Sequence, residues 1–481
     1  MTVQVLNRIG GEQRPAADGA CFERRNPADT GQVVSLAPES GRADVHAAVD
    51  AGLEAGRAWR DTAPSTRADI LSTAGRVLAG QAAELAAELV AEEGKLLSDA
   101  RMEAGRSAKN LELYAGEALR LTGTTFPSDD DTLVWSTRDP VGVVGVITPW
   151  NFPLNMPSRK IGPALAAGNT VVFKPSPMTP LMGERLADAL TEAGLPAGVL
   201  NVVHGSAAGA LVVADERVRA VTFTGSLATG RKIHAAMGLG RRVQLELGGK
   251  NPVVVLADAD LDGAAAVVVR SSFNLSGQAC TGAGRILVAD EVHDGLVERV
   301  EALAAGYVLG PGDRDGVTMG PLVDENALAA MERAVTQAVA DGAQVVCGGQ
   351  RAIEDDLALG CYFPPTILID VEPGTALSCD EVFGPVIGFE RVSDLDHAIA
   401  SANAVEYGLA AAICTRSMVA AQRFCGEVEA GMVRVNRPTV GAAINAPFGG
   451  VKLSGTGVHK EQLGPTVMDF YTQSRTIWLG T

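Results

Sequence analysis

Short runs of β-branched residues alternate with helical stretches between residues 141 and 248, and this alternation is the strongest constraint on the fold. Strands are predicted at 141–147, 170–173, 199–203, 220–223 and 242–246. Helices are predicted near 157–167, 178–193, 206–214 and 227–238. Strands that alternate with helices form a parallel sheet covered on both faces, an architecture typical of nucleotide-binding domains.

The rest of the chain divides into three further patterns. Residues 45–121 are rich in Ala, Leu, Glu and Arg at helical spacing, which predicts three or four helices. A second α/β unit runs from 252 to about 435, with helices expected near 260–274, 291–305, 324–341 and 394–403. Residues 133–138 and 471–479 are extended in character and are predicted to pair as a small protruding sheet. Because an exposed sheet edge needs a partner strand, this favours a homodimer or homotetramer.

Composition excludes several classes of protein. With 481 residues, two to four structural units are expected, and the net charge of −17 argues against unspecific binding to nucleic acid or anionic membranes. Residues 1–20 lack the pattern of a signal peptide, and no apolar run is long enough to span a membrane. The 7 cysteines form no Cys-x-x-Cys pair, so neither a zinc site nor a disulfide framework is indicated. We expect reduced thiols, no metal and a cytoplasmic protein.

Cys280 stands out among the cysteines. It lies in the run 276–282, between glycines and small polar residues, where a substrate can approach a sulfur atom. This context fits a nucleophile and also fits one more small buried thiol. Residues elsewhere in the chain have to decide between these two interpretations.

Two other polar residues follow predicted strands. Glu246 ends the strand 242–246, at the carboxyl edge where open α/β sheets bind ligands. It is suited to act as a general base, and also to an ordinary solvated or salt-bridged role. Asn151 lies between two prolines after the strand 141–147, so its amide can donate to an oxyanion, or it can be a simple turn residue.

Further strand ends carry groups that suit a nucleotide. Lys174 and Ser176 follow the strand 170–173, and the run 223–226 places a glycine and Ser226 before a predicted helix, where a phosphate can bind. Glu381 lies in a predicted turn and can accept hydrogen bonds from a ribose, although most loop glutamates are simply solvated. The Gly-x-Gly-x-x-Gly fingerprint of dinucleotide-binding domains is missing.

Together these motifs resemble the aldehyde dehydrogenase superfamily, and the resemblance covers nearly the whole chain. Seven motifs occur in the order and at the spacing of that family: PWNFP at 149–153, GNTVVFKPS at 168–176, FTGS at 223–226, ELGGKNP at 246–252, GQAC at 277–280, EVFGPV at 381–386 and PFGG at 447–450. The resemblance implies a variant Rossmann cofactor domain (1–122 and 141–248), an α/β catalytic domain (249–450) and a small β oligomerisation extension (123–140 and 465–481).

The resemblance also implies roles for individual residues. Cys280 is the implied nucleophile, Glu246 the general base and Asn151 the oxyanion donor together with the backbone N–H of Cys280. Lys174 and Ser176 are implied to hold the adenosine ribose side of NAD or NADP, Ser226 the pyrophosphate and Glu381 the nicotinamide ribose. Further implied cofactor contacts are Thr148, Pro149, Trp150, Pro177, Gly205, Gly209, Phe223, Thr224, Gly225, Leu247, Gly248 and Phe383.

The implied reaction oxidises an aldehyde to its acid through a thiohemiacetal and a thioester on Cys280. Glu246 favours hydrolysis of the thioester, because family branches that transfer the acyl group to coenzyme A often lack this glutamate. A cysteine-dependent ester or thioester hydrolase would need no dinucleotide motifs, and a non-catalytic protein on this scaffold would not need Cys280, Glu246 and Asn151 together. Both remain as alternatives.

Two positions bear on specificity. Many NAD-preferring members carry an acid where this chain has Pro177, so we expect NADP to be at least tolerated. Arg159 occupies a position where members with apolar substrates often carry tryptophan, and it resembles branches that act on anionic aldehydes, although a surface arginine would also fit. The neighbouring pocket positions, Asn155, Asn274, Ala442 and Phe448, predict a wall that is polar or small rather than aromatic.

The aldehyde itself is less defined by the sequence. Succinate semialdehyde enzymes place a second arginine where this chain has Asn274, which argues against that substrate. The run 435–457 resembles the 2-oxoglutarate semialdehyde branch of the family. We expect a short aldehyde with an anionic or hydroxylated tail.

Overall fold

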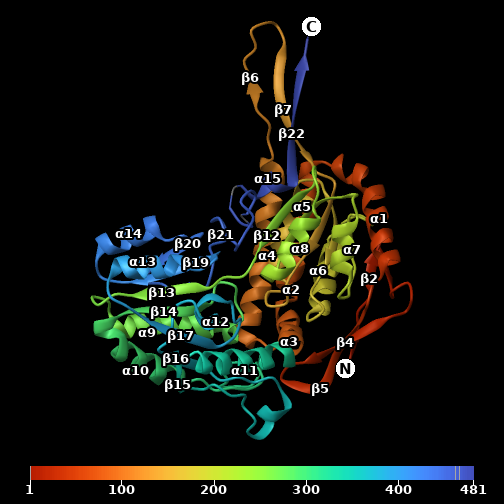
Figure 1. Ribbon diagram of the computed structural model, residues 1–481. Coiled ribbons are helices and arrows are strands. Elements are labelled where there is room, and N and C mark those ends of the chain that lie inside the picture. The colour runs from red at the N-terminus through yellow and green to blue at the C-terminus, as the bar shows by residue number, and fades with distance from the viewer. Residues whose placement is uncertain (1, 461, 465, 481) are drawn as a thin grey trace.

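The computed structural model describes residues 2–460, 462–464 and 466–480, and it is built around two seven-stranded sheets (Figure 1). The bounds 1, 465 and 481 of the predicted domains lie outside the described residues. The division into those domains stays a prediction, whereas the sheets and the helices that cover them are described below.

The first sheet contains the five predicted parallel strands. Its order is β12 (Arg242–Glu246), β11 (Val218–Thr224), β8 (Val143–Ile147), β9 (Thr170–Lys174), β10 (Leu200–Val202), β2 (Asn7–Ile9) and β3 (Glu12–Arg14). The last two strands are antiparallel additions that the sequence analysis did not predict. They are only three residues long and carry charged side chains, so they lack the apolar run by which a strand is recognised.

Both faces of the first sheet are covered, as the alternation predicts. Val144, Val146 and Phe173 pack on one face with the helices α2 to α6, and Val143, Ile147 and Val172 pack on the other with α1, α7 and α8. The helices are α1 (Arg42–Arg60), α2 (Pro64–Gly80), α3 (Ala82–Glu93), α4 (Leu97–Arg120), α5 (Asn155–Ala166), α6 (Pro180–Glu192), α7 (Ala208–Ala214) and α8 (Leu227–Ala236). The expectation of three or four helices in residues 45–121 is confirmed, with four.

The second sheet has its own helical layers. Its order is β15 (Gln344–Cys347), β16 (Thr366–Ile369), β17 (Val386–Val392), β14 (Ala283–Ala289), β13 (Asn251–Val255), β19 (Ala410–Cys414) and β20 (Met432–Val435), with only β15 antiparallel. Its helices are α9 (Leu261–Phe273), α10 (His293–Ala304), α11 (Glu325–Ala340), α12 (Ala376–Cys379), α13 (Leu395–Asn403) and α14 (Met418–Glu427). Short 3₁₀ turns lie at Asn274–Gly277, Asp290–Val292 and Asp355–Leu359.

The predicted pairing of residues 133–138 with 471–479 is confirmed. β7 (Leu133–Pro140) pairs antiparallel with β22 (Thr472–Leu479) along their full lengths, and β6 (Thr125–Phe126) adds a short third strand. This sheet projects away from the body of the molecule (Figure 1). The remaining elements are β1 (Val3–Gln4), β4 (Cys21–Asn26), β5 (Asp29–Pro38), β18 (Tyr407–Gly408), β21 (Val451–Lys452) and α15 (Val467–Tyr471).

The connection between the two sheets positions the chemistry. β12 ends at Glu246 and β13 begins at Asn251, so the carboxyl edge of the first sheet meets the amino edge of the second. Cys280 lies just before β14, the neighbour of β13. Glu246 and Cys280, which the sequence places at separate positions along the chain, therefore both lie where the two sheets meet.

Candidate active site

Cys280 is held in a tightly packed loop between α9 and β14. Leu275, Ser276 and Gly277 all have positive φ, at 53°, 54° and 71°. A Cβ on Gly277 would lie 2.2 Å from the carbonyl oxygen of Gly384, so only glycine allows this close approach of the two loops. Two successive non-glycine residues in the left-handed region store strain, which persists at sites where the surroundings enforce it.

Hydrogen bonds fix the backbone on both sides of the sulfur. The Asn251 amide donates to the carbonyls of Cys280 and Gly282, each at 2.8 Å. The Asn151 Nδ2 donates to the carbonyl of Gln278 at 2.9 Å. Asn151 therefore lies beside the cysteine loop, with one of its two amide hydrogens engaged there.

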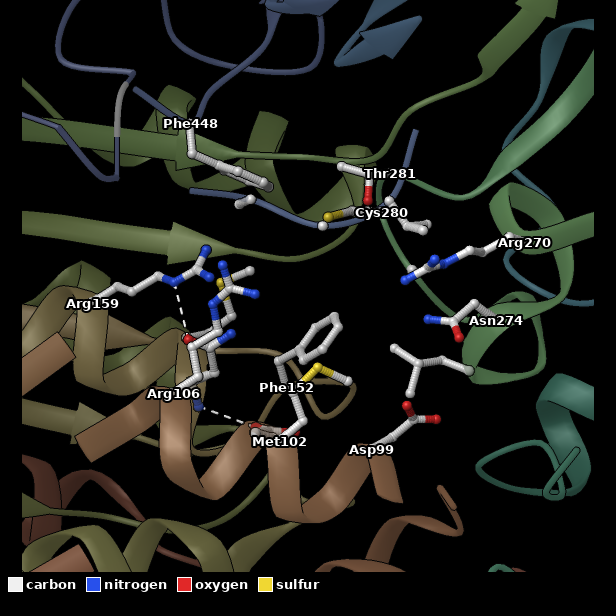
Figure 2. A pocket seen from close by; sticks show the side chains of 18 residues that line it. Asp99, Met102, Arg106, Phe152, Arg159, Arg270, Asn274, Cys280, Thr281 and Phe448 are labelled. Atoms are coloured by element: carbon white, nitrogen blue, oxygen red, sulfur yellow. Dashed lines mark hydrogen bonds between the residues drawn. The ribbon is translucent and has the colours of Figure 1, made fainter. Parts of the chain in front are cut away.

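The Cys280 side chain is partly accessible and lines a cavity of about 250 Å³ (Figure 2). Burial raises the pKa of its thiol, and the charges of Glu246 and Glu381 raise it further, whereas Arg159 opposes them. The thiol is therefore protonated at neutral pH, and its use as a nucleophile requires a base.

Glu246 has the environment of such a base. Its side chain is 1 % exposed, and neither carboxylate oxygen has a hydrogen-bond partner among the described residues. Burial raises the pKa of Glu246 to about 8, against the opposing charges of Lys160 and Arg159. A carboxyl group in this state takes up and releases protons near neutral pH. A salt-bridged or solvated surface glutamate is excluded.

A buried ion pair that the sequence analysis missed supports the Asn151 segment. Lys95 Nζ donates to Glu103 Oε2 at 2.5 Å and to the Asn151 carbonyl at 2.8 Å. The other oxygen of Glu103 accepts from the backbone N–H groups of Leu154 and Asn155. This network anchors both ends of the turn that presents Asn151. In the sequence this pair is visible only as a lysine and an acid in a region of helical pattern. That region has the composition of an ordinary helix surface.

The cavity beside Cys280 contains every predicted substrate position. Its wall includes Arg159, Asn155, Asn274, Ala442 and Phe448. Arg159 is 3 % exposed, which excludes the surface interpretation. The expectation of a wall without aromatic character is wrong, because Phe152 and Phe448 both line the cavity and the Arg159 guanidinium lies 5.4 Å from the Phe448 ring centroid.

Two further arginines line the same cavity and were not recognised from the sequence. Arg106 comes from α4, and Arg270 from α9, one turn before Asn274 (Figure 2). Arg159 Nε donates to Asn155 Oδ1 at 3.1 Å, and its terminal nitrogens donate to none of the described residues. Asp99 and Glu103 also line the cavity, but Glu103 is neutralised by Lys95. The lining is therefore net positive.

The predicted cofactor residues lie along the carboxyl edge of the first sheet and the loop of Glu381. Lys174, at the end of β9, is 8 % exposed, and burial lowers its pKa to about 8. Ser176 and Pro177 follow it, and Thr148 donates its N–H to the Lys174 carbonyl at 3.3 Å. Ser226 is the N-cap of α8 and is exposed. This edge presents a lysine, hydroxyl groups and the start of α8, where the Ser226 hydroxyl accepts from the Thr229 N–H.

Glycines keep this edge open and closely packed. A Cβ on Gly225 would lie 2.4 Å from the Phe223 ring, and one on Gly248 would lie 1.8 Å from the Glu381 carboxylate. Glu381 accepts from the Gly249 N–H at 3.2 Å, and burial raises its pKa to about 7.

Aromatic and apolar contacts complete the same edge. The rings of Trp150, next to Pro149, and Phe383 meet edge to face at 5.5 Å, which joins the two loops. Leu247 points instead into the core against Gly230. The Thr224 hydroxyl accepts from Gln462 at 2.9 Å.

Gly205 and Gly209 border the start of α7, next to Lys174. A Cβ on Gly209 would lie 3.5 Å from Lys174 Cδ. Small residues at 205–209 and the buried cation of Lys174 are features that fit the adenosine end of a dinucleotide. The described residues therefore fit NAD or NADP, although the chain lacks the Gly-x-Gly-x-x-Gly fingerprint.

Comparison with known proteins agrees with this geometry. The model of the aldehyde dehydrogenase family matches residues 14–477. The alpha-ketoglutarate semialdehyde dehydrogenase of Haloferax volcanii is 40% identical over 99% of both chains, and the alpha-ketoglutaric semialdehyde dehydrogenase of Bacillus subtilis is 37% identical over 98% of both. The succinate-semialdehyde dehydrogenase [NADP(+)] of Escherichia coli is 39% identical over 95% of this chain and 94% of its own.

Solved structures show the same fold. An NADP dependent enzyme of E. coli superposes with a TM-score of 0.94 at 36% identity, over 99% of this chain and 98% of its own. An NAD-dependent aldehyde dehydrogenase of Sinorhizobium meliloti superposes with a TM-score of 0.95 at 34% identity, over 100% of this chain and 95% of its own. The chain belongs to the aldehyde dehydrogenase family and is an oxidoreductase that acts on aldehydes. Among the described helices none has both the length and the hydropathy to cross a bilayer.

Proposed function

We propose that this enzyme oxidises a short semialdehyde, an aldehyde with a carboxylate at its far end, to the corresponding diacid with NAD⁺ or NADP⁺. The observation that carries the proposal is the Arg159 guanidinium, which is buried in the wall of the Cys280 cavity with its terminal nitrogens free. A planar guanidinium of this kind binds a carboxylate through two parallel hydrogen bonds. The semialdehyde dehydrogenases among the relatives support the same substrate class.

In the first step Cys280 attacks the aldehyde. Because burial raises the pKa of its thiol, a base must take the proton. The charges of Glu246 and Glu381 both act on the sulfur, and of the two Glu246 is the carboxylate with both oxygens unpartnered among the described residues. The sulfur forms a bond to the carbonyl carbon, and the carbonyl electron pair moves to oxygen. The free amide hydrogen of Asn151 and the Cys280 N–H stabilise this oxyanion, a contribution of on the order of 3 kcal/mol per donor.

The second half of the reaction releases the acid. Glu381 would hold the nicotinamide ribose, and the dinucleotide, when bound, would supply the hydride acceptor that the oxidation of the tetrahedral carbon requires. The resulting thioester on Cys280 is attacked by water, Glu246 takes the water proton, and the Cys280 thiolate leaves. The unpartnered oxygens of Glu246 are available for this proton transfer.

The cavity restricts the length and charge of the substrate. Arg106 on α4 and Arg159 on α5 form one wall of the cavity. Arg270 on α9 and Asn274, just after α9, form another (Figure 2). Arg270 is exposed and Arg159 is buried, so positive charge lines the route from the opening inwards. Phe152 and Phe448 provide apolar surface for a short methylene chain.

For the cofactor we propose that Lys174 and Ser176 bind the adenosine ribose side and Ser226 the pyrophosphate. Pro177 supplies no carboxylate at the 2′ position, so NADP⁺ should be accepted as well as NAD⁺. Negligible rates with NADP⁺ at the concentration at which NAD⁺ is active would contradict this expectation.

We also propose that the projecting sheet of β6, β7 and β22 joins subunits of a homodimer or homotetramer. Trp478, Leu479, Leu133 and Phe126 are exposed there, which is unusual for a free sheet in water. The free cysteines support the expected cytoplasmic location.

A panel of aldehydes tests the proposed function. Semialdehyde acids of four to six carbons and neutral aldehydes of equal length are assayed with NAD⁺ and NADP⁺, following reduction of the dinucleotide. We expect kcat/KM to be at least about 10-fold higher for an acid than for its neutral counterpart, about 1.4 kcal/mol. Equal values would remove the anionic substrate class. Ester hydrolysis without any reduction of dinucleotide would favour the hydrolase alternative.

A further inference from the structure

Glu39 lies next to the proposed adenosine site although it comes from a distant part of the chain. It occupies the turn between β5 and α1, where its N–H donates to the Ala20 carbonyl at 2.9 Å. The adjacent Ser40 N–H donates to the His204 carbonyl at 3.1 Å, and the Ser40 hydroxyl donates to Asn7 at 2.9 Å. These bonds hold Glu39 against the turn that follows β10.

The two oxygens of the Glu39 carboxylate differ in their hydrogen bonds. Its Oε1 accepts from the Ser206 N–H at 2.6 Å and from the Ala207 N–H at 3.4 Å, and its Oε2 accepts from none of the described residues. A Cβ on Gly205 would lie 2.9 Å from Glu39 Oε1 and 2.8 Å from the Ser40 nitrogen, so glycine is required for this contact. One oxygen thus takes the N–H groups in front of α7, and the other stays available.

Lys174 supplies the second, independent observation. Its side chain is buried and makes no hydrogen bond or ion pair with the described residues, and its methylene chain passes Gly209, the second residue of α7. The charge of Glu39 acts on Lys174 and opposes the effect of burial on its pKa. A buried cation and a carboxylate with a free oxygen therefore border the same short segment, 205–209.

We propose that Glu39 is a specificity-determining residue, which supplies from the N-terminal segment the carboxylate that Pro177 does not provide. Its free oxygen accepts a hydrogen bond from the adenosine ribose, and its charge disfavours a 2′-phosphate. A 2′-phosphate would also have to compete for the Ser206 and Ala207 N–H groups, which Glu39 already occupies. The proposal rests on the proposed cofactor site and sets the balance between NAD(H) and NADP(H) within it.

Binding measurements in the absence of aldehyde test the preference between NADH and NADPH. Dissociation constants of NADH and NADPH are measured by nicotinamide fluorescence for the wild-type enzyme, for Glu39→Gln and for Glu54→Gln, an exposed glutamate of α1 that controls for net charge. Gln keeps an oxygen acceptor for the Ser206 N–H, and thermal unfolding checks that the fold is retained. In Glu39→Gln we expect NADPH to bind about 5- to 10-fold more tightly relative to NADH, as expected for removal of one nearby charge. Glu54→Gln should leave the ratio unchanged.

Salt dependence of the wild-type enzyme gives a second readout. With Glu39 beside Lys174 the local charges cancel, so lower ionic strength should strengthen NADPH binding no more than NADH binding. A much stronger gain for NADPH in the wild-type enzyme, or an unchanged NADH to NADPH ratio in Glu39→Gln, would overturn the proposal. Failure of the wild-type enzyme to bind either nucleotide would instead overturn the cofactor site itself.

Discussion

The catalytic centre and the substrate cavity share Cys280 but are built in different ways. Glu246 ends the strand β12, and Asn151 and Cys280 lie in loops next to strands. Their positions follow from the sheets and from backbone hydrogen bonds. Arg106, Arg159 and Arg270 come from three helices that differ in sequence position and meet only in the folded chain. By the proposal, residues at the strand ends perform the chemistry, whereas residues on the helices select the aldehyde that reaches Cys280.

Replacement of the nucleophile should affect all substrates equally. Cys280→Ser is expected to lower kcat on the order of 10⁴-fold for acidic and neutral aldehydes alike, because a serine hydroxyl is far less acidic than a thiol. The measurement is dinucleotide reduction with the aldehyde panel. Retention of more than a few per cent of activity with any aldehyde would mean that another group forms the covalent bond.

Removal of the base should slow release of the acid and change the pH profile. Glu246→Gln is expected to lower kcat on the order of 10³-fold. In the wild-type enzyme the carboxylate is the active form and its pKa is about 8, so the rate should rise as pH increases through 8. Lys160, whose pKa burial lowers to about 7, titrates nearby and should broaden this rise. A variant that keeps the wild-type pH dependence would assign the titration to another group.

Loss of the amide donor should have a smaller effect. Asn151→Ala is expected to lower kcat by about 100-fold with little change in KM, because the hydrogen bond forms only to the oxyanion. Since Asn151 also donates to the Gln278 carbonyl, thermal unfolding is measured in parallel. A rise in KM without a fall in kcat would assign Asn151 to substrate binding instead.

Changes in the cavity should separate substrates. Arg159→Ala is expected to raise KM for a semialdehyde acid by about 10- to 30-fold and for a neutral aldehyde of equal length by less than about 3-fold. Equal losses for both would indicate that Arg159 only supports the packing of Phe448 and Asn155. Arg270→Ala serves as the matched variant at the exposed opening, where solvent screening should limit the effect to about 3-fold.

The sequence predicted that Glu246, Asn151 and Lys174 lie at strand ends, because they follow strongly apolar strands, and it singled out Cys280 because it lies among glycines; their roles stay predictions. Glu246 and Lys174 were placed at sheet edges from the strand pattern alone, and the parallel strands 141–147 to 242–246 were found within a few residues. Lys95, Glu103, Arg106 and Arg270 could not be recognised, because a charged residue on a helix looks the same whether it faces solvent or a cavity. Glu39 was missed for a related reason, since its partner segment 205–209 is distant in sequence.

The expectation about the cavity wall was wrong, and the short N-terminal strands were not predicted, because both depend on contacts between distant segments. The cavity wall was expected to lack aromatic rings, but the turn that carries Asn151 also presents Phe152, and the chain near 448 folds back over Arg159. The strands β1 to β5 were not predicted, because their short runs contain charged side chains and are stabilised by pairing with other segments. Such pairing is a tertiary effect that local sequence does not encode.

The most direct test of the central claim is the mass of the Glu246→Gln enzyme after reaction with a semialdehyde acid and dinucleotide. In this variant solvent must take the Cys280 thiol proton, so the attack is slow, but the thioester should still accumulate because water attack on it also lacks its base. A slow burst should give about one equivalent of reduced dinucleotide per active site and an acyl adduct on the peptide that contains Cys280. An unmodified Cys280 peptide after such a burst, or an adduct on another of the 7 cysteines, would contradict the assignment of Cys280 as the acyl carrier.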